Sequence, residues 1–366
     1  MARAWRLRRG TTAQNNSFTG LSGELVADMD KKQLRVHDGT KAGGYVIGEK
    51  TEHGPDRFLV AVSATTLKVK AGVRVAVGTT FFETDTEQTF APASCLDTGS
   101  SLAAGKDYYV YVATNDNSTA AIVCSLSATA PSGYTSYRRI GGFHTLCVNV
   151  GSITGHTLTG FTAGSILPQS VWCLNHYPRC LDINNAAGMV YIEPTDSWVD
   201  IYNMGTGGES AYGAARANNL QHYQFAELAR QQGKDLIGDQ EFFIASQGSN
   251  QQTAVAGAAQ PNPDTTGGRN DTAGRRMISN YGCEEMCGLQ WQHLNGWSAA
   301  GGSNWNGQNG GQGQFYGSAM ILLAGGDWGN SSYCGSRSRN ANNSLSFALA
   351  NNGARGRSPA IHTWHA

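Results

Sequence analysis

The sequence lacks an excess of charge of either sign. Its 366 residues include 27 lysine and arginine side chains and 27 acidic ones, so the formal net charge is zero. Basic residues cluster only near the start, at Arg6, Arg8 and Arg9. A protein that binds nucleic acid or an anionic membrane usually attracts it with a basic surface. The charge balance therefore argues against nucleic acid and a membrane surface as partners.

Long hydrophobic runs are absent as well. A membrane-spanning helix needs about 20 consecutive apolar residues, whereas the apolar run at 319–324 stops after six. The basic residues at the start are not followed by the apolar segment of a signal peptide. We therefore expect no membrane insertion, and synthesis and folding in a cytoplasm.

The cysteines form neither a disulfide framework nor a zinc-binding pattern. In a chain of this size without a signal peptide, scattered cysteines are more often buried thiols than disulfides. The alternative to buried thiols is a metal or redox site, which the spacing of Cys283, Cys287 and His293 would allow. No second pair stands at zinc-ligand spacing, so core thiols are favoured and no metal site is predicted. The eight residues are Cys95, Cys124, Cys147, Cys173, Cys180, Cys283, Cys287 and Cys334.

Glycine is abundant instead, with 47 residues, and favours turns and strands over helices. Residues 1–49 contain three short alternating segments, at 5–12, 23–28 and 33–39, with turn residues between them. So short a unit, with so few apolar residues, cannot bury an adequate core by itself. We therefore expect it to pack against further copies of the same chain.

Residues 50–165 predict an all-β domain. Six runs favour strands, at 58–62, 66–69, 74–77, 88–90, 108–112 and 121–124, and their spacing is typical of a β-sandwich. Glu83, Asp85 and Glu87 alternate along the chain and could attract a cation. A solvated strand face is the favoured interpretation.

Residues 166–366 have a different layout. A helix is predicted at 225–233, closed by Gly233, and a second one through 240–245 with Asp239 as its N-cap. A polar stretch at 246–275 has no periodicity and predicts an extended loop. Two helices followed by loop-rich strands with many tryptophans and glycines are the layout of a C-type lectin fold.

The segment from Gly325 to Gly356 alternates between two kinds of residue. Small or constrained ones, among them Gly325, Gly335 and Ser346, are typical of a scaffold. The residues between these small ones have no chemical property in common, whereas a core strand would place similar apolar residues at every second position. The pattern therefore indicates side chains that contact a ligand. This assorted set comprises Asp327, Gly329, Ser331, Tyr333, Asn340, Asn342, Asn343, Leu345, Phe347 and Leu349.

Several short motifs, in order along the chain, resemble the major tropism determinant family of phage receptor-binding proteins, which a diversity-generating retroelement diversifies. The resemblance implies an N-terminal β-prism (1–49), a middle β-sandwich (50–165) and a C-terminal C-type lectin domain (166–366) that carries the variable face, assembled as a homotrimer. The motifs include Arg9-Gly10-Thr11-Thr12, Val36-His37-Asp38-Gly39, Gly141-Gly142-Phe143-His144, Gly335-Ser336-Arg337 and Gly353-Ala354-Arg355-Gly356.

The family's diversification makes a coding test available. Mutated adenines turn Asn codons into codons for a limited group of residues, and every member of the assorted set belongs to that group. Trp305 aligns near a further variable position, but Trp cannot arise from an Asn codon, so Trp305 is predicted as a contact only. Extra residues at 350–352 leave the register of the last variable position open.

The resemblance also implies partners and location. The expected partners are a host cell-surface protein or glycan, two further copies of the chain and other virion tail proteins, with the chain at the tip of a tail fibre on the virion. No enzyme activity and no cofactor are predicted, although a structural calcium ion is left open. Arg337 and Arg355 are expected to be scaffold residues rather than ligand contacts.

Three alternatives stay open at this point. Formylglycine-generating enzymes use a related fold, and Cys283, Cys287 and Cys334 are the candidates for their reactive cysteines. A diversified binding protein displayed on a cell surface would use the same chemistry in another place. Calcium-dependent sugar binding has partial matches at Gln260-Pro261-Asn262 and Trp305-Asn306-Gly307, although a fold alone does not fix a function.

Overall fold

The structure is a computed structural model in which two compact units, Met1–Glu52 and His53–Ala366, can be distinguished. No helix of the described residues is long and apolar enough to cross a membrane. At 297–300, 306–307, 313–314 and 318–319 the backbone alone is described. The described residues are 7–47, 52–116, 119–183, 188–300, 306–307, 313–314 and 318–364.

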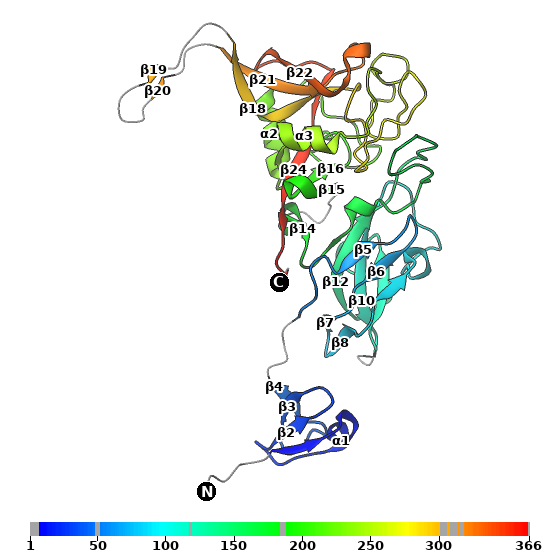
Figure 1. Cartoon of the computed structure of the whole chain (residues 1–366), viewed down its shortest axis with the longest axis vertical. Coiled ribbons are helices and arrows are strands. Elements are labelled where there is room, and N and C mark those ends of the chain that lie inside the picture. Colours follow the sequence, from blue (N-terminus) through cyan, green and yellow to red (C-terminus); the bar gives the residue numbers. More distant parts are fainter. Residues whose placement is uncertain are drawn as a thin grey trace. The chain divides into compact units, whose positions relative to one another are not determined.

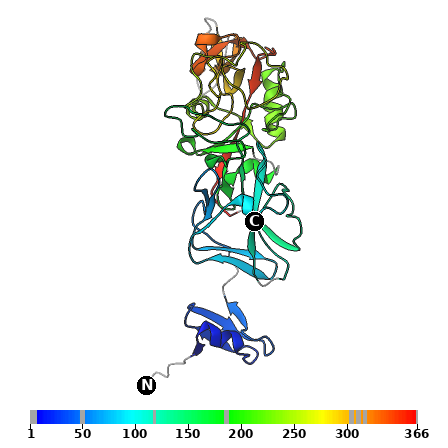
Figure 2. The ribbon, with the colours of Figure 1, turned by 90° about the vertical axis from the view of Figure 1, so that its right-hand side faces the viewer.

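The N-terminal unit is a four-stranded sheet with one short helix, α1 (Thr12–Ser17) (Figures 1 and 2). The three predicted strands are present, whereas α1 and the fourth strand were not predicted. A six-residue helix is too short to show an apolar periodicity. The sequence feature that indicates α1 is the capping box formed by Thr11 and Gln14. The strands, in sheet order, are β1 (Arg8–Gly10), β2 (Leu25–Asp28), β3 (Gln33–Val36) and β4 (Tyr45–Ile47).

One face of this sheet is closed by a buried ion pair. Arg35 Nη2 lies 2.9 Å from Asp28 Oδ2, and Arg35 Nη1 donates to Asn16 Oδ1 (2.9 Å) and to the carbonyl of Gly43 (3.1 Å). Within 7–47, Val26 is the one fully buried large apolar side chain. The interior of the unit is therefore largely polar.

The opposite face of the sheet is apolar and exposed. Register places Leu34 between Ala27 and Ile47, with Leu25 and Tyr45 on the same side of the neighbouring strands. The exposed fractions of Leu25, Leu34, Tyr45 and Ile47 are 36%, 40%, 48% and 46%. We refer to this surface, Leu25, Ala27, Leu34, Tyr45 and Ile47, as the apolar sheet face.

The middle of the chain is a β-sandwich, as predicted. All six predicted strand segments form strands, and β8 and β12 were missed. Strands of three sheets share one core that includes Val69, Val75, Val110 and Ile140. The sheets are β5 (Leu59–Ala61), β6 (Leu67–Val69) and β9 (Gln88–Phe90); β7 (Val73–Val77) and β8 (Thr80–Thr84); and β11 (Ala121–Ser125), β10 (Asp107–Thr114), β12 (Ser136–His144) and β13 (Trp172–Cys173).

Two details of the sandwich follow from its residues. A side chain at Gly142 would come within 2.7 Å of the Trp172 ring, so only glycine lets β13 pair with β12. The acidic residues at 83, 85 and 87 are exposed, and Glu83 and Glu87 form ion pairs with Arg74 (2.7 Å) and Lys68 (2.9 Å). The predicted solvated strand face is confirmed.

The C-terminal part has two further sheets and two helices (Figure 1). One sheet joins β14 (Tyr177–Pro178), β24 (Gly356–Ile361), β16 (Ser197–Asp200) and β15 (Met189–Ile192), with β17 (Asp235–Leu236) also paired to β24. The other has the order β22 (Gly335–Ser344), β21 (Ser318–Gly325), β18 (Trp291–Ala300) and β23 (Asn352–Ala354). A short pair joins β19 (Asn306–Gly307) to β20 (Gly313–Gln314).

Both predicted helices are present, as α2 (His222–Gln231) and α3 (Asp239–Ala245). Gly233 follows α2 with φ +71°, the left-handed conformation that its predicted role in ending the helix requires. The predicted N-cap of α3 is wrong: Gly238 is the N-cap and Asp239 is the first helical residue. Helix α3 contacts strands of both C-terminal sheets and thus lies between them (Figure 1).

The middle and C-terminal parts interlock around the predicted boundary after residue 165. Leu146 and Leu158 belong to the C-terminal core, whereas β13, further along the chain, completes the sandwich. His144 lies 2.7 Å from Asp107 Oδ1 through Nδ1 and 3.0 Å from the Tyr202 hydroxyl through Nε2. This buried contact ties the two parts together, and the predicted boundary stays a prediction.

Candidate functional site

The assorted set lies on an edge strand and the turns that flank it. Strand β22 pairs with β21 on one side only, with Asn343 opposite Ile321 and Asn340 opposite Leu323. Ile321 and Leu323, on the neighbouring strand, are fully buried. An apolar strand, β21, lies beside the polar edge strand β22 and holds the outer segment in place (Figure 1). Most side chains of β22 are exposed or partly exposed.

Nine of the ten residues of the assorted set are accessible. Tyr333 is 80% exposed, Leu349 46% and Leu345 39%. None of the nine carries a carboxylate, an amine, a guanidinium or an imidazole. They form a neutral, partly aromatic surface, suited to recognition and without a group for acid–base chemistry. The exposed set is Gly329, Ser331, Tyr333, Asn342, Leu345 and Leu349, with Asn340, Asn343 and Phe347 partly exposed.

The tenth residue contradicts the expected exposure. Asp327 is only 5% exposed, and its Oδ1 accepts the amide hydrogen of Gly329 (2.8 Å) while Oδ2 accepts a hydrogen bond from Asn351. Its own amide donates to Asn330 Oδ1 (2.8 Å). An aspartate with these bonds organises a turn and offers no oxygen to a ligand. Trp305, the eleventh predicted contact, lies outside the described residues.

Glycines between the exposed residues allow close backbone contacts. A Cβ at Gly325 would lie 2.5 Å from the Met286 carbonyl, and one at Gly335 would lie 2.4 Å from Gln251 Oε1. Gly325 also has φ +94°, which other residues rarely adopt. For Gly325 and Gly335 the expected scaffold role is confirmed, since both allow the outer segment to contact other parts of the chain closely. Ser346, expected in the same scaffold, is exposed.

The last turn of the segment is anchored through its carbonyl groups. His222 and Asn219 donate from their amides to the carbonyls of Leu345 (3.3 Å) and Leu349 (3.1 Å). Trp291 at the start of β18 donates to Asn351 O (2.9 Å). Because the bonds go to the backbone, they constrain the chain path without restricting the side chains. A site of this kind tolerates sequence change.

The two arginines of the segment behave differently. Arg355 is fully buried, as expected for a scaffold residue, and Nη1 donates to the carbonyls of Asp200 (2.5 Å) and Ile201 (2.6 Å). Its Nη2 donates to Asn203 Oδ1 (3.0 Å) and to the Glu284 carbonyl (2.5 Å). Arg337 is exposed, and its guanidinium lies 6.0 Å from the centre of the Phe243 ring.

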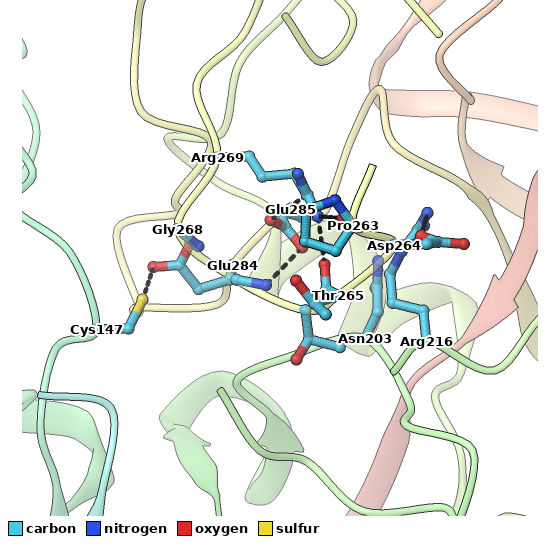
Figure 3. Close-up of polar contacts among 12 residues, drawn as sticks. Cys147, Asn203, Arg216, Pro263, Asp264, Thr265, Gly268, Arg269, Glu284 and Glu285 are labelled. Atoms are coloured by element: carbon cyan, nitrogen blue, oxygen red, sulfur yellow. Dashed lines mark hydrogen bonds and ion pairs between the residues drawn. The ribbon is translucent and has the colours of Figure 1, made fainter. Parts of the chain in front are cut away.

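A buried ion network holds the long loop at 246–275, and the sequence reasoning missed it (Figure 3). Arg276 Nη2 contacts both carboxylate oxygens of Glu284, at 2.6 and 2.9 Å. Glu284 and Glu285 in turn accept the amides of Gly268 (3.1 Å) and Gly267 (3.0 Å). The sequence signal was a pair of adjacent glutamates in an otherwise apolar stretch.

The same network reaches further loops. Arg269 donates to the carbonyls of Pro263 (2.9 Å) and Thr265 (2.7 Å), and Arg216 pairs with Asp264 (Figure 3). Burial, with Glu284 beside it, raises the pKa of Glu285. Removing one member of such a network leaves a charge buried without its partner, which is costly. The loop is therefore held as rigidly as a core element.

The cysteines that the enzyme alternative needs are buried and protonated. Burial raises the pKa of Cys283 to about 11 and those of Cys287 and Cys334 to about 12. A thiol is nucleophilic only as its thiolate, which these values suppress near neutral pH. Among the described residues, no group of three or more histidines, cysteines and acids is placed to hold a metal ion.

Comparison with known proteins covers nearly the whole chain. It is 32% identical over 393 aligned positions to the "Tail fiber receptor-binding protein" of Bordetella phage BPP-1, a match that spans 97% of this chain and 98% of that protein. Residues 6–41 match the model of the major tropism determinant N-terminal domain, and residues 57–173 that of the Mtd second domain. The chain belongs to the major tropism determinant family.

Solved major tropism determinants have the same architecture. The U1 variant is 28% identical with a TM-score of 0.70, and the I1 variant is 28% identical with a TM-score of 0.71; each match covers 98% of this chain and 100% of the other. The resemblance drawn from the sequence motifs is confirmed. So is the mainly β fold class, with a C-type lectin fold at the C-terminal end.

Proposed function

We propose that this chain is a receptor-binding protein of a phage tail fibre, and that the accessible residues of the assorted set contact a ligand on the host surface. The proposal rests on two observations together. The relative from phage BPP-1, matched over nearly its full length, is a tail fibre receptor-binding protein. Most residues with no common chemistry reach solvent, Tyr333, Leu345 and Leu349 foremost, and the small residues Ser344 and Ser346 between them are exposed as well.

The scaffold explains how such a surface binds usefully. Association costs translational freedom and the ordering of loops, and a preformed surface reduces the second cost. Here the backbone of the outer segment is bonded through Leu345, Leu349 and Asn351, and its first turn through Asp327. The binding free energy of a few aromatic and aliphatic anchors is therefore not offset by the entropy cost of ordering the chain.

We further propose that a diversity-generating retroelement changes these positions. Asn340, Asn342 and Asn343 are the residues an unmutated template would encode, and every other accessible member of the set is reachable from an Asn codon. Sequencing the gene's surroundings tests this proposal. A near-repeat of the stretch for 325–356, with adenines at those positions and a reverse transcriptase gene nearby, is expected; a neighbourhood without both contradicts it.

Self-association into a homotrimer is supported by the apolar sheet face. Leu25, Leu34, Tyr45 and Ile47 are each more than a third exposed in one chain, although the unit has little apolar core of its own. Three such sheets around one axis would cover each other's apolar faces and form the β-prism that the family resemblance implies. Other copies of the chain are therefore the proposed occupants of this face.

Light scattering on the full chain tests the trimer. The unmodified chain is expected at three times its mass of 38.9 kDa, and Leu34→Glu, which buries a charge in the proposed contact, should give monomers. Leu126→Glu, at a leucine that is 50% exposed outside the N-terminal unit, is the matched control and should stay trimeric. A monomeric wild-type chain at micromolar concentration would reject the proposal.

Binding to host cells tests the function itself. Tyr333→Ala and Leu345→Ala should each weaken attachment by about tenfold or more, because exposed anchors carry most of the binding energy. Tyr137→Ala removes a 40% exposed tyrosine of the sandwich and should leave binding unchanged. Equal losses for the two tyrosines would show that Tyr333 has no special role. Antibody labelling of purified virions separates a virion location from display on a cell.

The proposed interaction needs no cofactor and no enzyme activity. Dialysis against EDTA should therefore leave attachment unchanged, since the exposed set supplies no carboxylate ligand for a cation. A loss of attachment that calcium restores would favour the calcium-dependent alternative. Three copies per trimer and several trimers per virion would strengthen weak single contacts by factors of roughly 10²–10⁴.

A further inference from the structure

A cavity of about 490 Å³ opens beside the start of β22, away from the side chains of the assorted set. Its walls come from the end of α3, the turn that follows α3, the end of the long loop and the first residues of β22. A volume of this size lies in the range of small-molecule sites. The residues that matter are Phe243, Gln247, Ser249, Gln251, Arg275 and Arg337, and we call it the arginine cavity.

The arginine cavity is positively charged. Arg275 and Arg337 both line it, and none of its lining residues is acidic. Arg275 donates to the carbonyls of Gly248 and Arg276 and interacts electrostatically with the Asp271 carboxylate. Arg337 has no ion pair with a carboxylate among the described residues. The nearby Asp239 is paired with Arg339 instead. The exposed guanidinium group of Arg337, with Arg275 beside the same cavity, favours an anionic ligand, which Arg337 would bind in a fork geometry.

A buried hydroxyl in the wall is left without a partner. Ser249 is only 5% exposed, and its Oγ makes no hydrogen bond within the described part of the chain. Most buried polar atoms are bonded, so an exception calls for an explanation. The Oγ atom is covered in this conformation, so a change of the Ser249 side-chain torsion would turn it toward a ligand oxygen in the cavity.

The wall is preformed. Gly248 has φ +81°, and a Cβ there would lie 2.4 Å from the Asn280 side chain, so the turn requires glycine. Gln251 Oε1 accepts the Ser336 amide (3.2 Å), and its Nε2 donates to the Ser249 carbonyl (3.3 Å). These bonds join the turn to β22 and fix the width of the cavity.

One wall offers an aromatic face. Phe243 is 36% exposed, and Arg337 lies over its ring at 6.0 Å from the centre. A partly exposed ring next to amides, a hydroxyl and two guanidinium groups fits a ligand that is flat and apolar on one side and rich in hydroxyls elsewhere. A carboxylate on that ligand would meet the arginines.

We propose that the arginine cavity binds an acidic monosaccharide unit, a sugar ring that carries a carboxylate, independently of any metal ion. This deepens the proposed function and rests on it, because the sugar would belong to the host surface. None of the cavity's lining residues belongs to the assorted set. The cavity would therefore supply a constant contact while the neighbouring surface changes.

Saturation-transfer NMR on the full chain tests the proposal, with methyl glucuronide as the probe. Methyl glucoside, which has a hydroxymethyl group in place of the carboxylate, is the matched neutral ligand. We expect a Kd on the order of 1 mM for the glucuronide, given its size, and no signal for the glucoside. Equal signals from the two sugars would overturn the proposal.

Three variants assign the signal to the cavity. Arg337→Gln should weaken glucuronide binding by about tenfold or more, since a charge-assisted hydrogen bond is lost. Arg230→Gln, at an exposed arginine of α2, makes the same change of charge elsewhere and should leave binding unchanged. Ser249→Ala should weaken binding without lowering the melting temperature, because its Oγ has no protein partner.

The remaining outcomes are also decisive. Unchanged glucuronide binding in Arg337→Gln overturns the assignment. A glutamate-containing peptide or acetate that displaces the glucuronide at equal concentration would show a site for any carboxylate, and would overturn the specificity for a sugar. Because free sugars are the probes, failure here leaves the attachment test with Tyr333→Ala untouched, so the two proposals fail separately.

Discussion

Asn351 donates a hydrogen bond from Nδ2 to Oδ2 of Asp327, 24 residues earlier in the chain. The bond joins the two ends of the segment that carries the exposed residues. Asp327 Oδ1 simultaneously holds the amide of Gly329, so one buried carboxylate organises the turn at the start and the return at the end. The closure fixes the outline of the proposed binding surface without involving any member of the assorted set that is exposed.

Replacing Asp327 with alanine should therefore lower the free energy of unfolding by about 1–3 kcal/mol, because buried donors lose their acceptor. Ser331→Ala, at an exposed position of the same turn, should change it by less than about 0.5 kcal/mol. Urea denaturation of both variants makes the measurement. Equal effects would mean that Asp327 does not hold the turn.

Arg355→Met should destabilise the chain by about 3 kcal/mol or more, since the guanidinium satisfies five buried oxygens at once. They belong to Asp200, Ile201, Asn203, Glu284 and Gln292. Arg337→Met, at an exposed arginine of the same segment, is the matched control and should cost less than about 0.5 kcal/mol. Thermal unfolding of the pair distinguishes scaffold from surface. A small effect of Arg355→Met would contradict the assigned role.

Acid should destabilise the C-terminal part through His293. Burial, with His222 beside it at 3.3 Å, lowers the pKa of His293 to about 3. The unfolded chain takes up this proton near pH 6.5 while the folded chain does not, so unfolding is favoured as pH falls from about 6.5 toward 3, by up to about 1.4 kcal/mol per pH unit. His293→Gln should reduce this slope by roughly one proton. Urea unfolding at pH 7, 5.5 and 4 measures it, and an unchanged slope would contradict the assignment.

Cys95 should be the first cysteine to react with iodoacetamide. Its Sγ lies 3.6 Å from that of Cys124, and the hydrogen bond from Cys124 lowers the pKa of the partly exposed Cys95 thiol. Cys283 and Cys334 should react only after unfolding, because their thiols are buried and protonated. Brief labelling at pH 7.5 followed by mass spectrometry shows the order. Attachment to host cells should survive the labelling; its loss would revive the enzyme alternative.

Local sequence patterns were sufficient for much of the secondary structure. The amphipathic run that ends at Gly233 predicted α2, and alternating residues predicted the six sandwich strands, since both signals lie within a few neighbours. Strand β12 was not predicted because Gly141 and Gly142 interrupt its alternating pattern. Both positions require glycine because a side chain there would collide with Trp172. The N-cap of α3 was misplaced by one residue, since Asp239 is suited to either position.

The sequence by itself determined the family and the mainly β architecture, and it singled out the segment that we propose binds the ligand. Motifs, turn residues and the alternation at 325–356 are local sequence patterns. Each can be recognised without knowing which other residues it contacts in the fold. Tertiary structure alone decided which members of the assorted set reach solvent: Tyr333 does, and Asp327, the one charged member, does not. It also created the Glu284–Arg276 network and the arginine cavity. Burial and charge pairing depend on contacts between residues far apart in the chain, so local sequence periodicity does not predict them.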